Sequence, residues 1–261
     1  MELDLKGRTA LITGASKGIG LGVAQRFASE GVNVVLAARS KEQLEKAAAA
    51  IRASSDVDVR HFALDLSKTS ECEKLCEAAP DIDILVNNAG AIPAGSLEQV
   101  DDKAWRAGWD LKVFGYINLS RAYFARMKAR RRGVILNVIG AGGERLDGGN
   151  YIAGGTGNAA LMAFTRALGG VSTDHNVRVV GINPGAIDTE RVSLFARKLA
   201  REKFGDEERW NEAIGNLPFS RPGTIDEVAA MVVFLAADLC GYISGTIITI
   251  DGGYTHRNSL I

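Results

Sequence analysis

Residues 13–20 read Thr13-Gly14-Ala15-Ser16-Lys17-Gly18-Ile19-Gly20 and join a short apolar run, residues 9–13, to an amphipathic run, residues 20–29. Glycines at a sharp strand-to-helix turn let the backbone approach a ligand closely. The helix that follows presents unpaired N–H groups and a partial positive charge, which suit a pyrophosphate. The alternative is a tight strand-to-helix connection that binds nothing. The candidate cofactor-binding residues of this turn are Gly14, Ser16, Lys17, Gly18, Ile19 and Gly20.

Outward from this turn, short β-rich runs alternate with helical patterns along the whole chain. The expected strands are residues 9–13, 33–38, 59–64, 82–86, 134–139, 177–182 and 246–250. Most of them are continuously hydrophobic, which is typical of a parallel sheet covered on both faces. The helical patterns include residues 20–29, 42–54, 101–131, 158–169 and 224–237. This order predicts an α/β fold with a doubly wound (Rossmann) sheet, mostly parallel and seven-stranded, with helices on both faces.

The chain of 261 residues has only five prolines and no linker-like or repeated segment, so we expect one dinucleotide-binding domain over residues 1–261. Residues 188–217 interrupt the alternation of strands and helices. This amphipathic stretch carries Phe195, Phe204 and Trp210, and its place in the chain predicts a substrate lid.

The charge and the cysteine content of the chain indicate which kinds of partner and ligand it can bind. Lys and Arg number 31 and so do Asp and Glu, which argues against nucleic acid or an anionic membrane surface as a partner. No stretch resembles a membrane span of about 20 apolar residues. Three cysteines and three scattered histidines favour neither a disulfide framework nor a metal site. We therefore expect a cytoplasmic protein with a small-molecule ligand and no metal.

The tip of the second expected strand indicates which dinucleotide binds. A ribose 2′-hydroxyl is usually held by Asp or Glu about 20 residues after the glycines. Here the strand ends in Ala38-Arg39-Ser40, without a carboxylate. Arg39 offers a bidentate fork for a 2′-phosphate and Lys17 a second cation, so the sequence favours NADP over NAD. The alternative is that both side chains are solvated surface charges.

Further motifs follow in order: Leu64-Asp65-Leu66, Asn87-Asn88-Ala89-Gly90, Asn183-Pro184-Gly185-Ala186-Ile187-Asp188-Thr189, and segments within residues 221–253. In these motifs the chain resembles the classical type of short-chain dehydrogenase/reductase over nearly its whole length. The resemblance implies NAD(P)-dependent conversion of a small alcohol or carbonyl. It adds candidate cofactor-binding residues: Asp65 at the adenine, Leu66, Asn88, Ala89, Gly90, Asn158, Pro184, Gly185, and Ile187 and Thr189 at the nicotinamide carboxamide.

The residues that the family uses for catalysis are replaced in this chain. The family has a Tyr acid, a Lys four residues later, a Ser that binds the carbonyl oxygen and an Asn on the preceding long helix. The corresponding positions here are Gly154, Asn158, Gly140 or Ala141, and Lys112.

We hypothesise that Lys112 returns a cation to the vacated space and that Tyr151, three residues before the usual position, is the proton donor. A cation beside a phenol stabilises the phenolate, as the usual Lys does. The alternatives are an ordinary, partly exposed helix lysine and a tyrosine at a subunit interface. In that case the chain is a catalytically silent NADP-binding or regulatory protein. A third option is non-redox chemistry with Lys112 as the base.

The expected helix 158–169 is apolar nearly all round, with Arg166 as its only charge. Such a helix is buried against a neighbour as well as against its own sheet. Short-chain dehydrogenases commonly pair through this helix and the one that carries Lys112, so the resemblance implies a homodimer or homotetramer.

Overall fold

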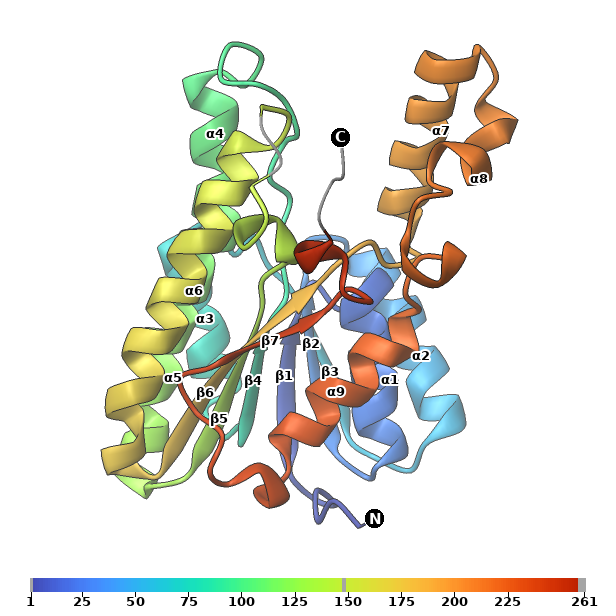
Figure 1. The fold of residues 1–261 in the computed structure, drawn as a ribbon. Helices are drawn as coiled ribbons and strands as arrows, with labels where there is room; N and C mark the ends of the chain where they lie inside the picture. The colour runs from blue at the N-terminus through green and yellow to red at the C-terminus, as the bar shows by residue number, and fades with distance from the viewer. Residues whose placement is uncertain (1, 147–148, 258–261) are drawn as a thin grey trace.

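The computed structural model describes residues 2–146 and 149–257, and these contain a seven-stranded sheet in the order β3-β2-β1-β4-β5-β6-β7 (Figure 1). Every neighbouring pair in this sheet is parallel, which confirms the predicted doubly wound fold. The strands are β1 (Thr9–Thr13), β2 (Asn33–Ala38), β3 (Val59–Ala63), β4 (Ile84–Asn87), β5 (Gly133–Val138), β6 (Val177–Pro184) and β7 (Ile247–Ile250).

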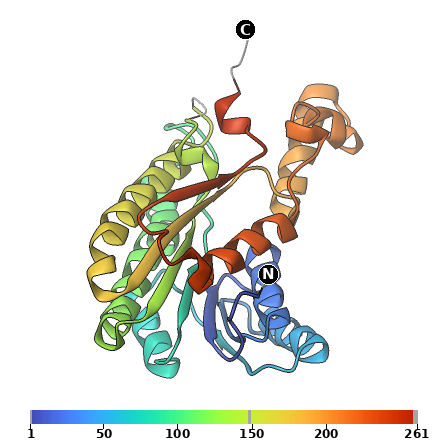
Figure 2. The same ribbon diagram turned by 60° about the horizontal axis from the view of Figure 1, so that its bottom comes forward.

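Helices cover both faces of the sheet (Figures 1 and 2). One face carries α1 (Gly18–Ser29), α2 (Lys41–Ser54) and α9 (Ile225–Ala236). The other carries α3 (Thr69–Ala78), α4 (Asp102–Trp109), α5 (Gly115–Arg130) and α6 (Ile152–Ser172). Successive strand residues point to opposite faces, so Leu11 packs with Leu75 of α3 whereas Ile12 packs with Val23 of α1. None of the described helices is long and apolar enough to cross a membrane.

Two predicted helices differ in a way that matters for the site. The stretch predicted as one helix over residues 101–131 is α4, then a π-helical turn, Asp110–Phe114, then α5. The helix predicted over residues 158–169 begins six residues earlier, at Ile152, and ends at Ser172. Glycines at 154, 155 and 157 lower the helix propensity of its first turns, which is why the sequence pattern placed its start too late.

Residues 188–217, the predicted lid, contain α7 (Glu190–Phe204), a 3₁₀ turn (Glu207–Arg209) and α8 (Trp210–Ala213). In Figure 1 this unit projects beyond the sheet, above α1 and α2 and apart from α4 and α6. Arg197 and Glu208 form an ion pair of 2.5 Å that ties α7 to the turn. Phe204 lies under the guanidinium of Arg209, 4.2 Å from the ring centroid, and the side chain of Phe195 lies outside the described part.

Candidate active site

The glycine turn and the end of β4 approach each other so closely that two of the glycines have no room for a side chain. A Cβ on Gly20 would lie 2.4 Å from the Gly14 carbonyl oxygen, and one on Gly14 would lie 2.9 Å from Asn88 Nδ2. Asn88 Nδ2 donates to the Thr13 carbonyl at 2.9 Å, and Thr13 Oγ1 accepts from the amides of Asn88 and Ala89. This cradle lies between β1 and β4, where the strand order reverses and dinucleotides bind in such sheets.

Lys17, Ser16 and Ile19 lie in this turn, but Lys17 has an additional partner. Its ammonium lies 2.5 Å from the carboxylate of Glu190, the first residue of α7. The hydrogen bond from Lys17 lowers the pKa of Glu190 below its ordinary value. Thr189 lies against Gly18, since a Cβ there would be 3.8 Å from Thr189 Cγ2. The ion pair therefore joins the glycine turn to the base of the predicted lid.

Arg39 lies just after β2, with its side chain exposed. Its guanidinium makes no hydrogen bond or ion pair with any residue in the described part of the chain. Asp65 follows β3, where its carboxylate accepts from Ser67 Oγ at 2.8 Å, and the neighbouring Leu66 is buried. Arg39 and Asp65 thus stand at the carboxyl ends of neighbouring strands.

The segment after β6 is held against β7. The Gly185 amide donates to the Ile250 carbonyl at 2.9 Å, and a Cβ on Gly185 would lie 2.7 Å from Asp251 Cβ. Pro184 is the last residue of β6, and Ile187 is buried and bridges to Gly223. The predicted nicotinamide-side residues therefore lie at the same edge of the sheet as the glycine cradle.

Lys112 is buried, with 9% of the residue exposed, so the alternative of a partly exposed helix lysine is wrong. It lies in the π-helical turn, and its Nζ donates to the Ile139 carbonyl, just after β5, at 2.5 Å. Its aliphatic stem crosses Gly90, where a Cβ would lie 2.8 Å from Lys112 Cδ. The ammonium is therefore carried from the helix layer to the carboxyl ends of β4 and β5.

Tyr151 precedes the first residue of α6, and its ring folds back over the helix. A Cβ on Gly154 would lie 1.9 Å from Tyr151 Cζ, and one on Gly142 would lie 3.5 Å from Cδ1. The ring thus occupies the space in which a side chain at residue 154 begins. Gly154 is the position predicted above to correspond to the family's catalytic tyrosine.

Asn158 lies one turn further along α6 and is 2% exposed. Its Oδ1 has no hydrogen-bond partner among the described residues. A Cβ on Gly140 would lie 3.2 Å from Asn158 Nδ2, so the loop after β5 passes directly over this amide. A buried acceptor without a partner is rare in folded proteins and fits a ligand hydroxyl.

Two buried groups near this site escaped the sequence reasoning. Tyr116, one turn after Lys112, donates from its hydroxyl to the Val138 carbonyl at 2.8 Å. Burial raises the pKa of Tyr116, and nearby Tyr151 raises it further, so this phenol stays protonated. Asn87 Nδ2 donates to Asn137 Oδ1 at 2.9 Å and thereby joins β4 to β5 in the core. Asn87 and Asn137 are paired in the register of β4 and β5, and an asparagine near the end of each of these strands was the sequence signal for this pair.

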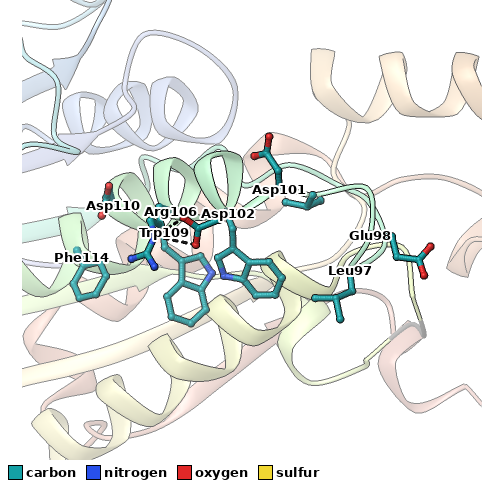
Figure 3. Close-up of a pocket in the computed structure, with 10 residues that line it drawn as sticks. Leu97, Glu98, Asp101, Asp102, Arg106, Trp109, Asp110 and Phe114 are labelled. Carbon is teal, nitrogen blue, oxygen red and sulfur yellow. Dashed lines mark hydrogen bonds and ion pairs between the residues drawn. The ribbon is translucent and has the colours of Figure 1, made fainter.

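A cavity of about 740 Å³ lies over α4, away from the glycine cradle, and all of its lining residues come from positions 97–114 (Figure 3). Trp105 and Trp109 form part of its wall, with ring centroids 6.3 Å apart. Trp109 Nε1 donates to the Ala153 carbonyl at 2.9 Å and fixes α4 to the start of α6. Within the described residues, no three His, Cys, Asp or Glu side chains form a group that could hold a metal ion.

Comparisons with known proteins agree with this geometry. Residues 14–255 match the family model described as enoyl-(acyl carrier protein) reductase. The 3-oxoacyl-[acyl-carrier-protein] reductase FabG of Chlamydia muridarum is 30% identical, over 97% of this chain and 99% of that protein. Galactitol 2-dehydrogenase (L-tagatose-forming) of Cereibacter sphaeroides is 31% identical, over 96% of each chain.

Among solved structures, L-sorbose reductase from Gluconobacter frateurii, complexed with NADPH and L-sorbose, has a TM-score of 0.92. It is 30% identical, and the match covers 99% of this chain and 100% of that one. The matches extend over the cofactor cradle, the sheet and the segment after β6. The chain therefore belongs to the classical short-chain dehydrogenase/reductase family of oxidoreductases.

Proposed function

We propose that this protein is an NADP(H)-dependent oxidoreductase that interconverts a small alcohol and its carbonyl compound, with Tyr151 as the proton donor and Lys112 as the cation of the site. The observation that carries the proposal is the position of the Tyr151 ring, which lies 1.9 Å from where a Cβ on Gly154 would be. The Tyr151 ring therefore lies beside the backbone position to which the resemblance assigns the family's tyrosine, although it comes from a different residue.

When bound, the nicotinamide exchanges a hydride with the carbon of the substrate. In the direction of reduction, Tyr151 donates the proton that the carbonyl oxygen takes up. Lys112 places a positive charge at the adjoining strand ends, and its burial reduces the screening of that charge by water. The charge stabilises the phenolate that remains after proton transfer.

The described residues fit a dinucleotide. The cradle of Gly14, Gly18 and Gly20 would receive the pyrophosphate at the N-terminus of α1. The buried Oδ1 of Asn158 would accept a hydrogen bond from a ribose hydroxyl. Arg39, exposed and without a side-chain partner among the described residues, would pair with a 2′-phosphate, which favours NADP over NAD. The NADPH bound in the similar structure of L-sorbose reductase supports this preference.

We place the chain in one domain, residues 1–261, with residues 188–217 as the lid. The ion pair between Lys17 and Glu190 supports the lid assignment, because it links the base of α7 to the turn that receives the pyrophosphate.

We also propose that the chain forms a homodimer or homotetramer through α4, α5 and α6. Leu97 and Phe114 border the cavity over α4 and are 66% and 49% exposed, and Val171 of α6 is 60% exposed (Figure 3). Burial of such side chains against a second copy removes them from water. Light scattering after size exclusion would report the mass of the particle in solution. A monomer at micromolar concentration would contradict the proposed homodimer or homotetramer.

Steady-state oxidation of NADPH with a panel of ketones and aldehydes tests the main proposal. We expect Tyr151→Phe to lower kcat by about 10² to 10⁴-fold, since it removes the general acid, while NADPH affinity stays unchanged. Tyr242→Phe is the matched control, because Tyr242 is fully exposed on the connection before β7.

Three other outcomes would each refute part of the proposal. NADPH binding without turnover of any carbonyl would favour the silent nucleotide-binding protein. Product formation without a change in cofactor absorbance would indicate non-redox chemistry. Equal losses of NADPH and NADH affinity in Arg39→Gln would remove the argument for NADP.

A further inference from the structure

The segment after β7, residues 251–257, begins at the carboxyl edge of the sheet, the edge that carries the candidate site. In Figure 1 its 3₁₀ turn, Tyr254–His256, stands between the α4 and α6 side of the molecule and the unit formed by α7 and α8. Figure 2 shows the same arrangement from another direction. The segment therefore has neighbours on both sides of the site.

On one side, the segment holds the loop that follows β5. The Arg145 guanidinium lies 4.5 Å from the centroid of the Tyr254 ring, and its Nη1 donates to the Tyr254 carbonyl at 2.8 Å. Thr249, within β7, donates to the Glu144 carboxylate at 2.6 Å. These contacts fix the backbone immediately before Leu146.

On the other side, the segment holds the connection between α8 and α9. Arg257 Nη1 donates to the Asn216 carbonyl at 3.0 Å. A Cβ on Gly252 would lie 2.6 Å from Pro218 Cβ and 3.3 Å from Phe219 Cδ2. The C-terminal segment thus sets where Phe219 lies.

Leu146 and Phe219 are large apolar side chains that remain 70% and 80% exposed. Leu146 Cδ2 lies 3.4 Å from where a Cβ on Gly155 would be, one residue beyond the position that the Tyr151 ring fills. Phe219 lies beside Gly252, which follows Asp251, the residue packed on Gly185. Leu146 therefore lies against the first turn of α6, which follows the proposed proton donor, and Phe219 lies against the segment that begins beside Gly185.

Phe219 also has a backbone conformation that phenylalanine rarely adopts, with φ of +55°. The next residue, Ser220, has the same φ. Non-glycine residues in the left-handed region cost energy and persist where the surroundings impose them. The contacts at Gly252 and Asn216 are surroundings of this kind.

We infer that the substrate carries an uncharged alkyl or aryl group next to its carbonyl, and that Leu146 and Phe219 hold this group from opposite sides. The inference rests on the proposed function and names its substrate class. Exposed apolar side chains that border a site bind a ligand by removing apolar surface from water. A polyhydroxylated ketone would turn its hydroxyls toward these side chains and lose hydrogen bonds to water.

Calorimetric titration of the NADPH-saturated protein tests this inference without needing turnover. The probes are acetophenone, an aryl ketone, and L-erythrulose, an open-chain polyhydroxylated ketone. We expect acetophenone to bind more tightly than L-erythrulose, and Leu146→Ser and Phe219→Ser each to weaken its binding by about tenfold. NADPH affinity should stay within about twofold, since neither side chain belongs to the cradle.

Leu239→Ser and Tyr242→Ser are the matched controls, because Leu239 and Tyr242 are comparably exposed but lie before β7. L-erythrulose binding as tightly as acetophenone, no acetophenone binding, or equal losses in the controls would overturn the inference. Turnover is measured separately on the same samples. Selective acetophenone binding without NADPH oxidation would refute the proposed function and leave the substrate class standing.

Discussion

Replacement of Gly154 by alanine tests the proposed role of Tyr151 against the silent nucleotide-binding protein, because it adds one methyl group at the point where the Tyr151 ring lies. The added Cβ would lie 1.9 Å from Tyr151 Cζ, whereas ordinary contact begins at 3.4 Å. The ring must therefore move by about 1.5 Å, since the Cβ is fixed by the backbone of α6.

The same substitution should help the helix. Alanine is favoured over glycine in a helix interior by about 1 kcal/mol. Displacement of the half-buried ring opposes this gain, so we expect the free energy of unfolding to change by less than about 1 kcal/mol. Turnover should respond very differently. A misplacement near 1 Å in a catalytic constellation costs about 10²-fold, so we expect kcat to fall by that factor with NADPH affinity unchanged.

Gly170→Ala is the matched control, because Gly170 lies in the same helix and a Cβ there would meet nothing within 4 Å. It should raise stability by about 0.5 to 1 kcal/mol and leave kcat unchanged. Urea unfolding, NADPH titration and steady-state turnover are measured for both variants. Wild-type kcat in Gly154→Ala would refute the assignment of Tyr151 as the proton donor.

Three further predictions concern stability and thiol reactivity. Arg178 is 8% exposed and donates to the carbonyls of Leu235 and Ala237 at the end of α9, at 2.8 and 3.0 Å. Arg178→Met should therefore lower the free energy of unfolding, measured by urea titration, by about 3 kcal/mol. The hydrogen bond from Arg8 lowers the pKa of Asp238, so the stabilisation that this bond gives the folded state is complete above about pH 4 and is lost as the pH falls through the lower pKa of the folded state. The difference in the free energy of unfolding between the wild type and Asp238→Asn should therefore narrow as the pH falls below about 4. A difference that stays constant with pH would contradict this prediction. Burial raises the pKa of Cys72 to about 11, so a thiol reagent at pH 8 should label Cys72 only after unfolding, as mass spectrometry would show.

Much of the fold was predictable because its signals are local. The glycine turn after β1 and the hydrophobic run at residues 134–136 of β5 depend on residues adjacent in sequence. The start of α6 was not predictable from the sequence, because Gly154 and Gly155 weaken every local helix signal there. The packing of this turn against the loop after β5 outweighs that weak propensity, since a Cβ on Gly155 would lie 3.0 Å from the Gly142 carbonyl oxygen.

Within the site, residue types were predictable, but their positions depended on longer-range packing. The π-helical turn and the crossing over Gly90 bury Lys112, and neither feature has a sequence pattern of its own. The exposed Arg39 followed from its place at a strand tip, whereas the pairing of Lys17 with Glu190 joins residues 173 positions apart. Contacts of that range are set by the tertiary fold.

The glycine at residue 154 bears on whether the site is rearranged or lost. A chain that lost the family's tyrosine without replacing it would have no physical need for glycine in the first turn of α6, since glycine is a poor helix former. Here glycine is required, because any Cβ would overlap the Tyr151 ring. The absence of a side chain at residue 154 and the phenol supplied by residue 151 are thus one packing arrangement. That coupling favours a relocated proton donor over a silent nucleotide-binding protein.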